Sequence, residues 1–557
     1  MTVDPIFDLL LPFGSIRMNA PSIRTKNLDH HGLVAGFCRE VGIAKLIDEA
    51  LPEQPRDKKL SYGQLLEAMI LNGLGFTGRT LHMYSQYFDD KPLERLFGEE
   101  ICAEDINDDA LGRCLDKLFE HGVSELYQML GEAVVKHLGL ACDGLNVDTT
   151  SFHVDGAYDV EDDFKGVRLK RGYSRDHRPE LNQVILSLIT ENQAGIPVYM
   201  KAHSGNSNDS ETFKKLVKSH ITSLKAAQVC RYLIGDSALY SRETIRELAA
   251  QDQYFITRVP QKISEARELL SNLDTLRFSD LSNGYRGAFV DSDYGDIKQK
   301  WLVVRSEQAK KREMKTLEKR IEKSMLASNK AFKKICCQNF SCRTDALMAL
   351  ETWIAKQDFA CFELSSIEQV TKHSRPGRPA KDDEGTKVYQ IRGTLQCSPD
   401  KKKKALANLG VFILSTNDVT EQLDMQSMLN HYKSQQKVEG GFRFLKSPDF
   451  LVASLFLKKP ERIEALLMVM TCCLMVYAAL EHQIRSKLQE TNSYFPDMKN
   501  KPYQKPTARW VFQNFQGIHE VIIDGTGIPV LITNLVDKHL IIINCLGSIY
   551  RKIYSVT

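Results

Sequence analysis

The sequence lacks several features that would by themselves identify its class. Its 557 residues include 13 Cys and only 3 Trp, and none of the cysteines forms a CxxC pair. Without such pairs, neither a zinc site nor a secreted disulfide framework is indicated, and we expect reduced thiols. The net charge is only +3, so overall charge does not point to nucleic acid as a partner.

Long hydrophobic runs and a leader pattern are also missing. The first residues, Met-Thr-Val-Asp-Pro, show no basic segment followed by an apolar one, so no signal peptide is expected. The apolar run 465–480 is 16 residues long, shorter than the roughly 20 that a bilayer requires. We therefore predict a buried core helix there, no membrane association and a cytoplasmic protein.

What is present is an ordinary globular composition, 43% apolar and 26% charged, in a chain long enough for about two to four domains. Charge is unevenly distributed, because residues 298–343 hold 14 Lys and Arg against 4 Asp and Glu. Such a local excess can face phosphates. The patterns predict a loose tail at 1–25, a helical DNA-binding domain at 26–140, an α/β core at 141–260 and 409–489, an insertion at 261–408 and a polar C-terminal region at 490–557 ending in a strand-like stretch at 540–544.

Periodicity supports this division. Apolar residues recur at helical spacing through 33–140, for example Leu111, Leu115, Leu118 and Phe119, with Asn107 or Asp108 as the N-cap. Strand patterns follow at 145–154, 181–190, 197–201, 232–235 and 254–258, with a helix at 210–224. Strands followed by helix–strand alternation indicate a mixed α/β fold. Within the insertion, the pattern predicts a hairpin at 287–306 and helices at 307–334 and 345–356.

Three acids stand in informative positions. Asp148 lies within an apolar, β-branched strand, where an unpaired charge is costly. Asp236 follows the short apolar strand Tyr-Leu-Ile-Gly, and strand ends are the usual place for ligands in α/β sheets. Glu439 lies in a segment predicted as one helix, where Tyr432, Glu439 and Lys446 recur at i, i+7 and i+14 and so share one side.

Taken singly, any Asp is more often a cap or a surface residue than a ligand. Asp143, Asp155 and Asp159 compete with Asp148, and we interpret them as strand-end or loop residues. Three carboxylates together suit Mg²⁺ or Mn²⁺, and phosphodiester cleavage uses two such ions about 3.5–4 Å apart. The sequence therefore suggests a carboxylate triad that holds two metal ions and cuts DNA.

The segment around Glu439 resembles the Y-x2-R-x3-E-x6-K signature of the hairpin-forming, cut-and-paste superfamily of bacterial insertion-sequence DDE transposases. Here the frame has Gln435 where that superfamily has Arg, and the other three positions match. Further blocks are similar to the N-terminal helical domain and catalytic core of one subgroup, at 28–40, 71–76, 106–113, 172–184 and 234–241.

The resemblance implies a ribonuclease-H-like core interrupted by a mainly β insertion, and an all-α N-terminal domain. It implies Asp148, Asp236 and Glu439 as catalytic metal ligands. It also implies phosphate contacts from Tyr432 and Lys446 and a further DNA contact from Arg258, while the loss of Arg at Gln435 puts one phosphate contact in doubt. Lys433, Lys437 or Arg443 could compensate for it.

Other DNA contacts are predicted from local chemistry. Ser374–Lys381 resembles an AT-hook, in which Arg375 and Arg378 would reach the minor groove of A·T-rich DNA; a plain Pro/Arg linker is the alternative. A flipped base would need an aromatic partner, for which Phe412 and then Trp301 are the candidates.

The overall expectation is a homodimeric, nucleoid-associated transposase acting on double-stranded DNA, at terminal inverted repeats and at a target. The alternatives are a ribonuclease-H-like nuclease without strand transfer and a catalytically silent DNA-binding descendant.

Overall fold

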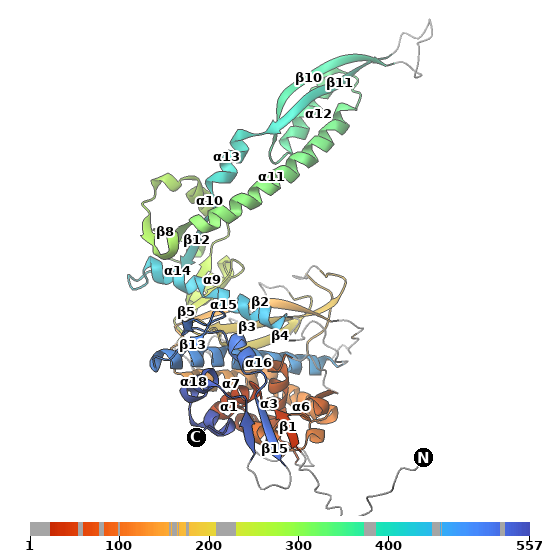
Figure 1. Cartoon of the computed structure of the whole chain (residues 1–557). Coiled ribbons are helices and arrows are strands. Elements are labelled where there is room, and N and C mark those ends of the chain that lie inside the picture. The colour runs from red at the N-terminus through yellow and green to blue at the C-terminus, as the bar shows by residue number, and fades with distance from the viewer. Residues whose placement is uncertain are drawn as a thin grey trace, which may run out of the picture. The chain divides into compact units, whose positions relative to one another are not determined.

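The structure is a computed structural model of the chain. It describes residues 23–53, 59–76, 83–98, 101–154, 158, 164, 166–173, 178–207, 230–372, 386–447, 450, 457, 459–523 and 530–556. The chain divides into two compact units (Figure 1). Unit 1 comprises Met1–Ile234 and Lys433–Thr557, and unit 2 comprises Gly235–Tyr432. Each unit is described by itself.

The first part of unit 1 is helical, as the periodicity predicts. Its α6 begins where expected, because the Asn107 side chain accepts a hydrogen bond from the Ala110 amide at 3.0 Å. The α3 helix begins with a capping box between Ser61 and Gln64. These helices are α1 (His31–Val41), α2 (Ile43–Ala50), α3 (Tyr62–Leu74), α4 (Tyr84–Phe88), α5 (Leu93–Phe97), α6 (Asp108–His121) and α7 (Val123–Leu138).

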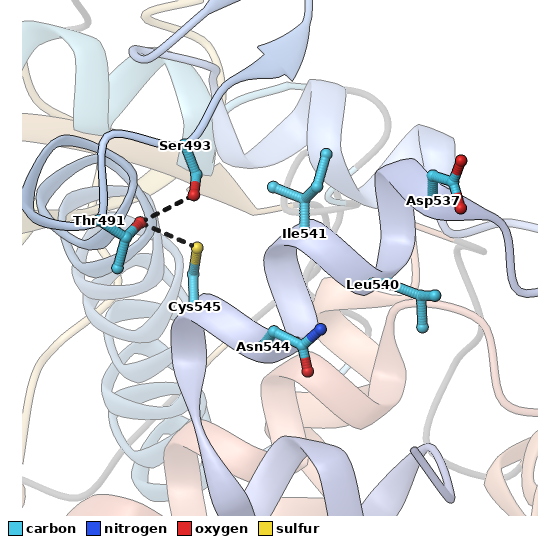
Figure 2. Close-up of a pocket in the computed structure, with 7 residues that line it drawn as sticks. All are labelled: Thr491, Ser493, Asp537, Leu540, Ile541, Asn544 and Cys545. Carbon is cyan, nitrogen blue, oxygen red and sulfur yellow. Dashed lines mark hydrogen bonds between the residues drawn. The ribbon is translucent and has the colours of Figure 1, made fainter. Parts of the chain in front are cut away.

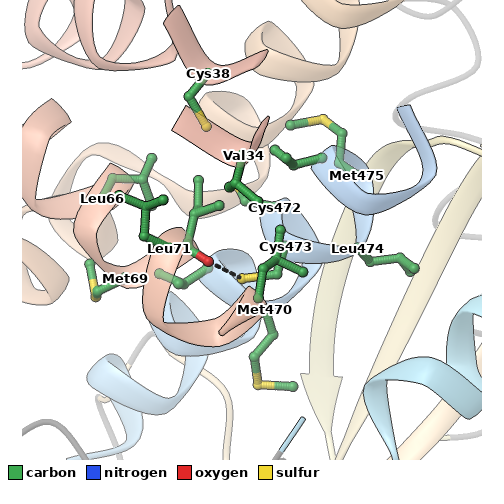
Figure 3. Close-up of a cluster of buried hydrophobic side chains, with 14 of the residues drawn as sticks. Val34, Cys38, Leu66, Met69, Leu71, Met470, Cys472, Cys473, Leu474 and Met475 are labelled. Carbon is green, nitrogen blue, oxygen red and sulfur yellow. Dashed lines mark hydrogen bonds between the residues drawn. The ribbon is translucent and has the colours of Figure 1, made fainter. Parts of the chain in front are cut away.

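The predicted core helix is α16 (Pro460–Glu490). It contacts α1, α3, α6 and α7 as well as the strand β4 (Pro197–Ser204), and so lies between the helices and the sheet of unit 1 (Figure 1). It is the one described helix long and apolar enough to cross a membrane, but 78% of its most apolar window is buried inside the protein, as expected of a core helix. Figure 3 shows the resulting cluster, in which Val34, Cys38, Leu66, Met69 and Leu71 pack near Met470, Cys472, Cys473, Leu474 and Met475.

The sheet of unit 1 has the strand order β4-β3-β2-β5. Its strands β2 (Gly144–Val154), β3 (Asn182–Glu191) and β4 pair antiparallel, and β5 (Tyr232–Gly235) runs parallel to β2 with Gly144 opposite Tyr232. Three antiparallel strands with a parallel fourth strand beside the first form a ribonuclease-H-like arrangement, which confirms the predicted α/β fold class. The helix predicted at 210–224 lies outside the described residues.

The C-terminal region differs from the prediction of a polar tail. It forms α17 (Ala508–Asn514), α18 (Asp537–Leu546) and α19 (Ser548–Ile553), and a strand, β15 (His519–Ile523), that pairs with β16 (Leu531–Thr533) and with β1 (Ile23–Asn27). Residues 23–25, assigned to a loose tail, therefore belong to a sheet. The α1 and α19 helices approach closely, because a Cβ added at Gly36 would lie 2.6 Å from the Tyr550 ring.

The strand predicted at 540–544 is wrong, since these residues lie within α18. The Ile-rich run has high β propensity. In the structure, however, Ile542, Ile543 and Leu546 are buried together on one side of a helix while Asn544 is exposed. Packing of α18 against the rest of unit 1 thus overrides the local preference of these residues for a strand.

Unit 2 contains a fully antiparallel set of strands in the order β6-β12-β9-β8-β7. These strands are β6 (Tyr254–Arg258), β7 (Ser279–Leu281), β8 (Tyr285–Ser292), β9 (Gln299–Ser306) and β12 (Val411–Thr416). The hairpin predicted at 287–306 is the β8–β9 pair.

The remainder of the insertion is built on helices and a long ribbon. The α11 helix (Glu307–Cys336) leads to α12 (Arg343–Ala355) and to the ribbon of β10 (Ala360–Lys372) and β11 (Thr386–Cys397), all of which share a small core (Figure 1). The insertion thus holds the expected strands together with these predicted helices and two shorter ones, α10 (Ser264–Ser271) and α13 (Pro399–Ala407), so its content is mixed.

Candidate functional site

Asp148 lies in the middle of β2, opposite Leu188 of β3. Apart from Asp148 and His153, every residue of this strand is buried. The Asp148 carboxylate is partly exposed, and its Oδ1 accepts a hydrogen bond from the Thr149 amide at 2.7 Å. The strand thus presents one carboxylate from an otherwise buried surface.

Glu439 lies on α15 (Gln435–Leu445), which packs against β2. The buried face of α15 consists of Val438, Phe442 and Leu445, whereas the Glu439 side chain is exposed. The helix that carries the third predicted acid is therefore held on the strand that carries the first, although 290 residues of sequence lie between Asp148 and Glu439.

Two contacts fix this packing at the ends of α15. At its start, the Ser434 hydroxyl donates to Oδ1 of the buried Asn146 at 2.7 Å. At its end, the Lys446 ammonium lies 5.5 Å from the centre of the Phe152 ring. Asn146 was not anticipated as important; a buried polar residue two positions before Asp148 in an apolar strand was the available signal.

The single helix predicted from Tyr432 to Lys446 is wrong. The segment forms two helices, α14 (Met425–Lys433) and α15, which are separated at Ser434. Serine competes with the helix by hydrogen bonding through its side chain, and here that side chain is bonded to β2 instead. Tyr432 belongs to unit 2 and Glu439 to unit 1.

Asp236 lies in unit 2, directly after β5. Its side chain is exposed, and its Oδ1 accepts a hydrogen bond from the Ala238 amide at 2.9 Å. The Asp236 carbonyl accepts a second bond from the Thr257 hydroxyl of β6 at 2.6 Å. These bonds hold the turn between β5 and α9 (Arg242–Ala250), so the carboxylate is presented at the end of a strand, as predicted.

Three residues predicted to contact DNA lie together in unit 2. The Arg258 guanidinium is 5.6 Å from the centre of the Phe412 ring, and that ring is 6.2 Å from the ring of Tyr432. All three side chains are partly exposed. Trp301 is different, because it is 2% exposed and its Nε1 donates to the Tyr240 hydroxyl at 3.1 Å. The Trp301 ring is therefore a core group with no face open to a base.

The other predicted DNA contacts have separate outcomes. Arg375 and Arg378 lie outside the described residues. Gln435 is the first residue of α15 and is half-buried. Lys437, a possible substitute for the missing Arg, instead donates its ammonium hydrogens to the carbonyls of Asn192 and Gln193, in the turn between β3 and β4. Arg443 is exposed one helical turn after Glu439.

Metal binding is supported by the type of donor and not by a formed cluster. Within the described ranges, no group of three or more His, Cys, Asp or Glu side chains is placed as metal ligands. Asp148 and Glu439 belong to unit 1 and Asp236 to unit 2, and the meeting of all three stays a prediction. Carboxylates at a strand end and on an exposed helix face are donors that suit Mg²⁺.

A separate pocket of about 490 Å³ lies between the end of α16 and α18 (Figure 2). The Thr491 hydroxyl contacts the Ser493 hydroxyl at 3.0 Å and the Cys545 thiol at 3.3 Å. Asp537 is the one carboxylate among its lining residues, so this pocket lacks the paired acids of a metal-dependent site.

Comparison with known proteins identifies the family. Residues 142–476, more than half of the chain, match the family described as Transposase DDE domain. The chain therefore belongs to the DDE transposase family. Residues 23–132 match a second family, described as Domain of unknown function (DUF4277).

A search of curated proteins found no match. Among solved structures, the chain is similar to the piggyBac transposase in its synaptic complex with hairpin DNA, with 10% identity, a TM-score of 0.33 and coverage of 88% of this chain and 82% of the other. It is also similar to the Mos1 transposase in its paired-end complex with the left transposon end, with 9% identity, a TM-score of 0.15 and coverage of 32% and 58%.

Proposed function

We propose that this protein binds the terminal inverted repeats of its own mobile element, cleaves the element's ends and joins the resulting 3′-OH ends to target DNA. Family membership supports a transposase. The observation that carries the site is the packing of the Glu439 helix on the Asp148 strand, with Asn146 and Ser434 bonded between them. This packing brings two of the three acids from distant sequence positions onto adjoining elements.

In this proposal, Asp148, Asp236 and Glu439 hold two Mg²⁺ or Mn²⁺ ions. When bound, such ions supply charge stabilisation for phosphodiester cleavage. The chain's own residues position the DNA. Lys446 binds a phosphate beside β2, Tyr432 and Arg258 bind phosphates near the cleaved end, and Phe412 stacks on an unpaired base, for which its partly exposed ring is suited.

The sequence of events follows the superfamily that the chain resembles. Water cleaves one strand, the freed 3′-OH attacks the opposite strand to form a hairpin, the hairpin is reopened and the 3′ ends attack target DNA. The N-terminal helices bind the inverted repeats, and Arg375 and Arg378 bind an A·T-rich minor groove. The active form is a homodimer on paired ends, in the cytoplasm at the nucleoid.

Cleavage and strand transfer should be measured separately on labelled duplexes carrying the element's end, with a supercoiled plasmid as target. Asp148→Asn, Asp236→Asn and Glu439→Gln should each abolish both reactions and leave DNA binding largely intact, because phosphate contacts come mainly from Lys and Arg. Asp143→Asn is the matched control, since Asp143 is an exposed acid just before the same strand, and it should remain active.

Three outcomes would contradict the proposal. Cleavage without joining by the wild-type protein would indicate a nuclease. Binding without any Mg²⁺-dependent nicking would indicate a silent DNA-binding protein. Equal activity of the Glu439→Gln and Asp143→Asn variants would remove Glu439 from the site.

A further inference from the structure

A short hairpin follows α16 in unit 1. It consists of β13 (Phe495–Pro496) and β14 (Pro502–Tyr503), with Phe495 opposite Tyr503. The Asp497 side chain fixes its tip, because Oδ1 accepts hydrogen bonds from the Lys499 and Lys501 amides, both at 2.8 Å. The Asp497 amide in turn donates to the Lys501 carbonyl at 2.9 Å. The tip therefore has a defined conformation.

The base of the hairpin is attached to the core. Phe495 is fully buried, and the Trp510 Nε1 of α17 donates to the Pro496 carbonyl at 2.8 Å. On the following segment, the Arg485 side chain of α16 donates to the Pro506 carbonyl at 2.9 Å. These contacts attach the hairpin to the rest of unit 1.

The hairpin exposes cations and apolar side chains together. Met498, at the tip, is 82% exposed, and Tyr503, opposite Phe495 on β14, is exposed as well. Between residues 498 and 509 the chain holds four cations and no acid. All four are exposed: Lys499, Lys501, Lys505 and Arg509. The exposed Met498 side chain at this ordered tip is therefore accessible to a binding partner.

Contacts within unit 1 connect this segment to α15. The Arg509 amide donates to the Tyr477 hydroxyl at 3.1 Å, and the Tyr477 ring lies 4.6 Å from the ring of Phe444, near the end of α15. Arg509, the last of the four cations, is thus connected through Tyr477 to the helix that carries Glu439.

We propose that the hairpin segment, residues 494–505, together with Arg509, is a DNA-binding element whose four cations contact phosphates of a duplex while Met498 enters its minor groove. The inference rests on the proposed function and adds a contact surface to it. Charge complementarity favours DNA as the occupant, since the four exposed cations match phosphates and the one acid of the segment, Asp497, has its carboxylate bonded to the Lys499 and Lys501 amides. Apolar side chains, Met among them, are known wedges in the minor groove.

The test compares full-length variants matched in charge and exposure. Lys499→Ala/Lys501→Ala removes two tip cations, and Arg551→Ala/Lys552→Ala removes two equally exposed cations of α19. The dissociation constant for a duplex of the element's end should be measured across a series of salt concentrations. The Kd rises with salt, and each lost phosphate contact lowers the slope of log Kd against the logarithm of the salt concentration by roughly 0.9. The hairpin variant should therefore lose about 2 from this slope, and the α19 variant should keep the wild-type value.

Met498→Ala separates the two parts of the inference. It should weaken binding while leaving the salt slope unchanged, because no phosphate contact is removed. A Kd and slope for Lys499→Ala/Lys501→Ala equal to those of the α19 variant would overturn the inference. So would an altered oligomeric state with unchanged DNA binding, which would make the hairpin a protein–protein surface. Absence of DNA binding by the wild-type protein would instead overturn the proposed function itself.

Discussion

Two adjacent glycines in the middle of α15, next to Glu439, offer a test of where DNA approaches. Around Gly441 the fold explains the glycine, because an added Cβ would lie 2.9 Å from Leu474 Cδ2. Around Gly440 no atom of the described residues lies within 4 Å of an added Cβ. Glycine in a helix interior costs about 1 kcal/mol relative to alanine, so Gly440 weakens α15 without a packing reason within those residues.

Gly440→Ala should therefore raise the free energy of unfolding by about 1 kcal/mol. Gly441→Ala gains the same helix propensity but must displace Leu474, and overpacking typically costs about 1–3 kcal/mol. Its net effect should be a loss of up to about 2 kcal/mol. Urea denaturation of both variants measures the difference.

Although Gly440→Ala should raise stability, it should lower the rate of DNA cleavage. If a duplex crosses α15 beside Glu439, the missing side chain leaves room for a sugar-phosphate backbone, and Gly440→Ala should cleave more slowly although it is more stable. A destabilised Gly440→Ala variant would refute the packing argument. A stabilised variant with wild-type cleavage would refute the approach of DNA over this position.

Other predictions concern the core and the aromatic cluster. Burial raises the pKa of the Glu67 carboxyl from 4.5 to about 7. The contribution of Glu67 to stability is therefore complete below the unfolded pKa and is lost as the pH rises through 7. Relative to Glu67→Gln, the wild type should lose roughly 2–3 kcal/mol of unfolding free energy between about pH 5 and 8 in urea denaturation, and parallel pH profiles of the two proteins would contradict this. Gly36→Ala should lower the free energy of unfolding by about 1–3 kcal/mol. The added Cβ would lie 2.6 Å from the Tyr550 ring, which is held in place by a 2.9 Å hydrogen bond from its hydroxyl to Glu40. An unchanged urea midpoint would disprove this clash. Phe412→Ala should slow end cleavage by about tenfold or more through lost stacking, whereas Phe412→Trp should retain it, and wild-type cleavage by Phe412→Ala would exclude a stacking role.

The parts of the fold that the sequence predicted are those set by strong periodicity. The N-cap and apolar spacing of α6, the core helix α16 and the strand around Asp148 all follow from residues that act locally. The long insertion was also predictable, since Asp236 and Glu439 are 203 positions apart in the sequence, far more than a loop contains.

What could not be predicted depends on partners distant in the sequence. The break at Ser434 coincides with the bond of its side chain to Asn146 of β2, a partner that the local pattern from Tyr432 to Lys446 does not reveal. The Ile-rich run in α18 resembles a strand until its burial against unit 1 is known. Trp301 is a candidate for stacking from the sequence alone. Its burial and its bond to Tyr240 exclude that role, and both arise only in the assembled sheet.

The central claim is that Asp148, Asp236 and Glu439 form one metal centre. Titration of Mn²⁺ into the wild-type protein with bound end DNA, followed by electron paramagnetic resonance, measures bound ions directly and needs no turnover. We expect about two tightly bound ions in the wild-type complex, and fewer or more weakly bound ions in Asp148→Asn, Asp236→Asn and Glu439→Gln alike, with Asp143→Asn unchanged. Wild-type stoichiometry and affinity in any one of the three variants would contradict a shared centre.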